Sequence, residues 1–161
     1  MSATGDFTEA EWQELRRFPL VVAALISAVD YSTLSEGKEY EAFAGFIRTA
    51  GAKRRKSEFI AEILDAPVEA DKESFLEYCT SIATAMSGDK PVERALLQAK
   101  ELARMVDTKL DKRAAKAYKE FILDVALAVA RAHKESALPF ASSVSKVEDF
   151  HIRRLSTALG I

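Results

Sequence analysis

The stretch PLVVAALISAV, residues 19–29, constrains the fold more than any other part of the chain. A surface helix carries polar residues along one side, but this segment is apolar on every side when it is wound as a helix. Such a helix has to be surrounded by other elements. The apolar run from Pro19 to Ile26 is also far shorter than the roughly 20 residues that span a bilayer. We therefore expect a central, buried helix and no transmembrane segment.

The residues before this stretch predict a helix of their own. Thr8 and Glu11 have the spacing of a capping box, in which each side chain accepts a hydrogen bond from the other residue's backbone, so a helix should begin near Glu9. Proline removes a backbone donor and disfavours helix in the residue before it. We therefore expect one helix to about Arg17 and a second one from Pro19 to about Val29, with a kink between them.

Apolar residues recur at helical spacing along the rest of the chain. The clearest amphipathic pattern runs from Val92 to Val106, and the apolar positions of the last helix include Phe150, Ile152 and Leu155. The expected helix starts follow Ser35, Ser57, Asp71, Asp89, Asp111 and Ser145, and the breaks fall near Gly51, Ala66, Ser87 and Gly160. No segment has a convincing strand pattern. We predict an all-α fold, a single-domain bundle of about seven to eight mostly antiparallel helices over residues 1–161.

Composition limits the class of protein. A chain of 161 residues that is 48% hydrophobic and 30% charged is typical of one globular domain. Its 23 basic and 25 acidic residues give a formal net charge of −2, so no overall attraction to nucleic acid is expected. The single cysteine, Cys79, excludes an intramolecular disulfide, and its place on an apolar stripe predicts a buried side chain. The N-terminus shows no secretory signal pattern, so we expect a cytoplasmic protein.

The stretch AVDYSTLSEGKEYEAF, residues 28–43, gathers acidic residues between two apolar runs. It is not an EF-hand, because the fifth and sixth loop positions counted from Asp30 are Leu34 and Ser35 in place of an oxygen ligand and glycine. A simpler cation site could use Asp30, Glu36 and Glu39. The alternative is a helix connection, in which acidic residues favour the positive end of the next helix.

A second candidate for metal chemistry is EDFH, residues 148–151. Glu148 and His151 have the spacing that places a carboxylate and an imidazole on one helix face, as in di-iron bundles. Such sites need a second copy, and the other histidine, His133, has Ala130 three residues before it. We therefore expect no di-iron centre, and Glu148 is explained as the partner of Ser145 in a capping box. It is retained as a candidate metal ligand together with the loop.

The run Lys53, Arg54, Arg55 and Lys56 is the strongest local charge feature. It is a candidate patch for nucleic acid or another anion, because clustered cations release counterions from phosphates. However, Glu58 and Glu62 follow at once, and no aromatic residues are interleaved for base stacking. We expect a solvated surface there and no nucleic-acid partner.

Two segments of the chain are similar to each other. Asp30 with Glu36 or Glu39, and Ser145 with Glu148, each follow an apolar helix and lead through a polar loop to a new helix start. The arrangement resembles the tellurite-resistance TerB-like helical domains, as does the closing LSTALGI. The resemblance implies a compact helical module linked to stress responses and to membrane-associated or multi-protein assemblies, rather than a defined enzyme.

These observations leave two functional interpretations. The first is a non-enzymatic cytoplasmic module that acts through a protein partner or as a homodimer, with a divalent cation at the loop of Asp30 as the only cofactor considered. The second is a metal-binding protein or a small metal-dependent enzyme with carboxylates from several helices. Convergent buried carboxylates would favour the second, and a dry apolar core with an exposed hydrophobic patch would favour the first.

Overall fold

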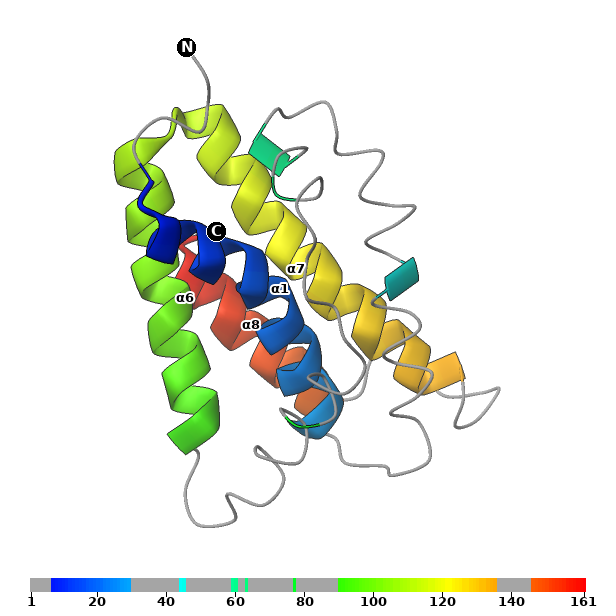
Figure 1. The fold of residues 1–161 in the computed structure, drawn as a ribbon. Coiled ribbons are helices and arrows are strands. Elements are labelled where there is room, and N and C mark those ends of the chain that lie inside the picture. The colour runs from blue at the N-terminus through cyan, green and yellow to red at the C-terminus, as the bar shows by residue number, and fades with distance from the viewer. Residues whose placement is uncertain are drawn as a thin grey trace.

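In a computed structural model of the protein, the described residues are 7–29, 44–45, 59–60, 63, 77, 90–135 and 146–161. Four helices are labelled in Figure 1: α1 (Glu9–Val29), α6 (Lys90–Lys109), α7 (Lys112–Glu135) and α8 (Lys146–Leu159). No strand occurs in the residues just given, so the all-α prediction is confirmed for them. The number of helices and the single domain over residues 1–161 stay predictions.

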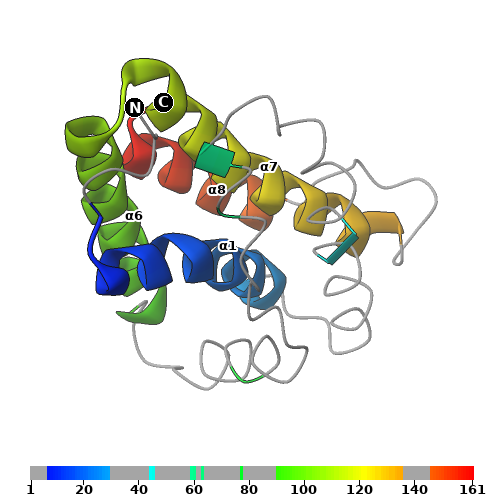
Figure 2. The same ribbon diagram turned by 45° about the horizontal axis from the view of Figure 1, so that its top comes forward.

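The four helices form two closely packed pairs. α1 packs mainly against α7, and α6 packs mainly against α8. The members of each pair run in the same general direction, whereas α6 and α7 run in opposite directions (Figure 1; a second view is Figure 2). The prediction that most helices of the chain are antiparallel stays a prediction. The two-residue connection between α6 and α7 makes these two antiparallel, whereas α1 and α7, like α6 and α8, are not consecutive, so no short connection fixes their relative direction.

The predicted break at Pro19 does not occur, because α1 continues through it from Glu9 to Val29. A proline inside a helix has no N–H for the carbonyl four residues earlier, which is that of Leu15. This carbonyl accepts a hydrogen bond from the Tyr118 hydroxyl of α7, with 3.0 Å between the oxygens. Burial raises the pKa of Tyr118 above its ordinary value, with a smaller contribution from the negative charge of Glu14, so the hydroxyl stays protonated. A residue of another helix thus replaces the donor that Pro19 lacks.

The predicted helix starts are confirmed where the structure describes them. Glu11 accepts a hydrogen bond from the Thr8 backbone N–H at 2.8 Å, and Thr8 Oγ1 accepts one from the Glu11 N–H at 3.2 Å. Asp111 caps α7, because its Oδ1 accepts the Ala114 N–H at 2.8 Å. Each cap satisfies amides that have no partner within the first turn of the helix.

The end of α8 has the geometry that its glycine predicts. Gly160 has a φ of 76°, a conformation that residues with a Cβ rarely adopt. Its N–H donates to the Thr157 carbonyl and the Ile161 N–H donates to that of Ser156, both at 3.1 Å. This pair of hydrogen bonds is a Schellman motif, which satisfies the last carbonyls of the helix.

The core surrounds the second half of α1, as the apolar stretch predicts. Its buried residues there are Leu20, Val22, Ala23, Ala24, Leu25 and Ile26. Trp12, in the first half, forms an aromatic cluster with Phe7 and Phe59, with centroid distances of 5.4 to 5.7 Å, and Phe59 lies 5.9 Å from Tyr118. The aromatic cluster joins the start of α1 to α7. None of the described helices is both long enough and apolar enough to cross a membrane.

Candidate functional site

Most of the predicted site residues lie outside the described residues. This holds for Asp30, Glu36 and Glu39 of the acidic loop and for the basic run 53–56. Glu148 lies in the first turn of α8, but its side chain is not among those described. The cation site and the anion patch therefore stay predictions.

The structure tests for a metal site only among the described side chains. No group of three histidine, cysteine, aspartate or glutamate residues among them is arranged to hold a metal ion. The acidic loop can be tested directly: metal analysis of the purified protein, and melting before and after chelation, in the native chain and in Asp30→Ala. A cation that binds only the folded state must raise the melting temperature, and the variant should lose that rise.

The described part of the chain does contain a groove between α6 and α8, with a volume of about 630 Å³. Both helices contribute to its lining, which consists of Glu93, Leu96, Leu97 and Lys100 from α6 and of Phe150, Arg153, Arg154, Thr157 and Ala158 from α8. The α6 residues follow the i, i+3, i+4, i+7 repeat of one helix face, and the first four α8 residues follow the same repeat. Each wall is therefore one continuous side of a helix.

The two largest exposed apolar residues of the lining face solvent, whereas Leu96 and Ala158 pack against the core. Leu97 is 58% exposed and Phe150 is 57% exposed, although both are large hydrophobic residues. The core face of each helix is different: α6 buries Ala95 and Ala99, and α8 buries Leu155. Each helix therefore buries apolar side chains on its core face and also carries exposed apolar side chains along the groove, where the two helices meet.

Phe150 and Ile152 are both apolar positions of the last helix in the sequence, but Ile152 is buried and Phe150 is exposed. The two are 200° apart around a helix, since each residue turns by about 100°. Leu97 stands in the same relation to the buried Ala99 and was not singled out. In both cases the sequence shows an apolar residue two positions before a core residue, and this spacing places the two residues on nearly opposite sides of the helix.

The polar part of the lining is mostly basic. The lining contains one carboxylate, that of Glu93, and three cationic side chains, those of Lys100, Arg153 and Arg154. The Arg154 guanidinium lies 5.6 Å from the Phe150 ring centroid, and Arg153 Nε lies 2.9 Å from an oxygen of Asp149 on the same helix. Even with Asp149 included, cations outnumber carboxylates. The groove therefore combines apolar contact surface with positive charge.

The described lining contains no histidine, cysteine or serine, and its one hydroxyl, on Thr157, donates to the Arg153 carbonyl at 3.0 Å. Comparison with protein-family models, with curated proteins and with solved structures gives no match for this chain.

Proposed function

We propose that this chain is a non-enzymatic helical module that works by binding protein through the groove between α6 and α8. The observation that carries the proposal is the exposure of Leu97 and Phe150 on the two walls of one groove. Single exposed hydrophobic residues are ordinary, but a concave surface with apolar side chains from two helices and a charged rim is typical of an interaction site.

The resemblance to TerB-like domains supports the proposal at the level of class only. It implies a helical module that acts within assemblies, and the proposal takes from it the cytoplasmic setting, the association with stress responses and the choice between a foreign partner and a second copy. A binding module needs no reacting groups, which agrees with a lining that provides contacts, cations and one hydrogen-bonded hydroxyl.

The test is a photoreactive amino acid in place of Leu97, introduced into the full chain in its native host. The control carries the same amino acid at Lys116, an exposed position on α7 whose side chain is 72% exposed and does not line the groove. Irradiation should give a defined adduct from position 97 and none from position 116. An adduct of twice the 17.8 kDa chain would identify a second copy, and any other mass a foreign protein. Equal labelling from both positions would exclude the proposed function.

A further inference from the structure

We infer that the occupant of the groove is an amphipathic helix with acidic flanks that belongs to another protein. This inference rests on the proposed function and names the chemistry of its partner. Two properties of the groove carry it: the helical repeat of both walls and the sign of the charges along them.

The side chains of the walls and the volume of the groove suit a bound helix. Leu97 and Phe150 provide apolar contact from opposite walls, and Leu96 and Ala158 add to the apolar surface between them. A volume of about 630 Å³ accommodates a few large side chains and not a folded domain. An amphipathic helix supplies such side chains from one face, at positions i, i+3, i+4 and i+7, which match the repeat of the walls.

The charges of the groove specify acidic flanks. Lys100 lies on the α6 wall together with Glu93, while Arg153 and Arg154 lie on the α8 wall, so a bound helix would have cations on both sides and a lining with a net positive charge. The whole chain has a formal net charge of −2, so this positive charge is a local property and not one of the whole chain. Carboxylates on either side of an apolar stripe complement it, and a basic helix would be repelled.

The same charges argue against a second copy as the occupant. In a two-fold symmetric dimer the same patch meets itself, so a lining with three cations and one carboxylate would face another lining of the same net positive charge. Like charges opposed across an interface oppose association. The concave shape, with Leu97 and Phe150 on facing walls, also suits a rod-like ligand better than the plane of a lipid bilayer.

The experiment measures binding of labelled model peptides to the full chain by fluorescence anisotropy. One peptide of about 18 residues, long enough to form a helix, has leucines at i, i+3, i+4 and i+7 with glutamates on both flanks, and its counterpart has lysine in place of every glutamate. We expect the acidic peptide to bind at least about tenfold more tightly at low salt, and added salt to reduce the difference.

Charge reversal makes the test specific to the groove. The variant Lys100→Glu/Arg153→Glu/Arg154→Glu should reverse the order of the two peptides. The matched control, Lys112→Glu/Arg113→Glu/Lys116→Glu, changes three exposed basic residues of α7 that do not line the groove and should keep the native order. Melting of both variants establishes that they are folded.

Three outcomes would overturn the inference. They are equal affinity for the two peptides, reversal of their order by the control variant, and an adduct from position 97 with twice the mass of the 17.8 kDa chain. A specific adduct from position 97 together with equal peptide affinities would retain the proposed function and reject the acidic helix as its partner. Absence of a specific adduct would reject the proposed function itself, whatever the peptides do.

Discussion

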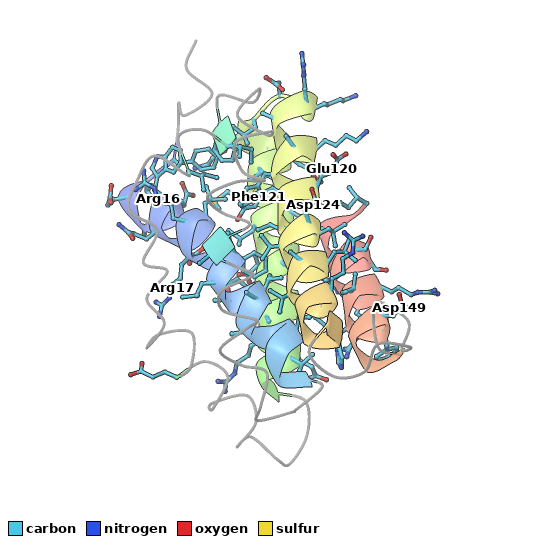
Figure 3. All side chains as sticks on the ribbon, turned by 90° about the vertical axis from the view of Figure 1, so that its right-hand side faces the viewer. Arg16, Arg17, Glu120, Phe121, Asp124 and Asp149 are labelled. Atoms are coloured by element: carbon cyan, nitrogen blue, oxygen red, sulfur yellow. The ribbon has the colours of Figure 1, made fainter. Side chains whose placement is uncertain are left out.

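The two helix pairs of this protein use their apolar residues in different ways. Between α1 and α7, Phe18 and Tyr118 are fully buried, and the carbonyl that Pro19 leaves free has a donor. Between α6 and α8, Leu97 and Phe150 are more than half exposed beside cations. In Figure 3, Arg16 of α1 and Asp149 of α8 lie at opposite edges of the view, although the two helices are in contact. The contrast separates the contacts that hold the fold from a surface that folding leaves open.

The largest predicted effect tests this contrast with one substitution in each pair. Phe18→Ala should lower the free energy of unfolding by about 3–5 kcal/mol, because it leaves a cavity in the core. Phe150→Ala should lower it by less than about 1 kcal/mol, because more than half of that side chain is already in water. Chemical denaturation of the two variants measures both values. A similar loss in both would mean that Phe150 is a structural residue, and the contrast would fail.

The next effect concerns the hydrogen bond from the Tyr118 hydroxyl to the Leu15 carbonyl, which Pro19 leaves without a backbone donor. Tyr118→Phe should cost about 1–3 kcal/mol, because it removes the buried donor to the Leu15 carbonyl. Pro19→Ala restores a backbone N–H that can donate to the same carbonyl. Tyr118→Phe should therefore cost less in the Pro19→Ala background than in the native chain. A double-mutant cycle by denaturation measures the difference.

Two independent, additive effects in that cycle would contradict this account of the proline. The control is Tyr118→Phe combined with Ala126→Gly, a change eight residues further along the same helix, about 12 Å from Tyr118, which should give additive losses. Additivity in the control and coupling in the test pair would assign the coupling to the shared carbonyl.

A smaller effect is expected at the end of α8, beside the groove. Gly160→Ala should destabilise the protein by roughly 1 kcal/mol, because alanine is strained at a φ of 76°. No heavy atom lies within 4 Å of the position of an added Cβ, so crowding adds nothing to this cost. Ile161→Ala, at a neighbouring residue that is 44% exposed, is the control and should have little effect. Equal stability of Gly160→Ala and the native chain would show that the Schellman motif does not hold α8.

Features encoded within one helical turn could be predicted from the sequence. The Thr8–Glu11 box, the Asp111 cap and the Gly160 terminus each depend on residues three to five positions apart, and the structure has all three. The burial of Leu20 and of residues 22–26 followed from a segment without a polar side. The continuity of α1 could not be predicted, because the donor that compensates for Pro19 lies 103 residues further along the chain than Leu15.

The groove could not be predicted from the sequence either, because it too depends on residues that are far apart in the chain. Its walls come from helices that the sequence identified, but their pairing depends on tertiary packing, which one sequence does not reveal. Periodicity could have placed Leu97 and Phe150 opposite the core faces, yet not beside each other. The sequence-based site predictions, Asp30, Glu36, Glu39 and residues 53–56, relied on local composition and lie outside the described residues.

The smallest predicted effect concerns the ion pair that connects the two helix pairs. Lys109 Nζ at the end of α6 donates to both carboxylate oxygens of Glu11 on α1, at 2.9 and 2.7 Å. These hydrogen bonds lower the pKa of Glu11, and the Thr8 backbone N–H lowers it further. A carboxyl group whose pKa is lower in the folded state stabilises the fold at pH values above its unfolded pKa of about 4.3. That stabilisation is lost as the pH falls through the folded pKa.

Glu11→Gln should therefore be less stable than the native chain near neutral pH, and the difference should shrink on acidification. Denaturation of both proteins between about pH 7 and pH 3 measures it. Glu9→Gln is the matched control, because it removes a carboxylate from the same helix end that accepts from Gln13 rather than from Lys109. A difference that stays constant or grows in acid would mean that the Lys109 contact does not stabilise the fold. A shrinking difference would show that the ion pair between Glu11 and Lys109 stabilises the contact of α1 with α6. The pair of α1 and α7 would then be connected to the pair of α6 and α8 by an ion pair as well as by packing.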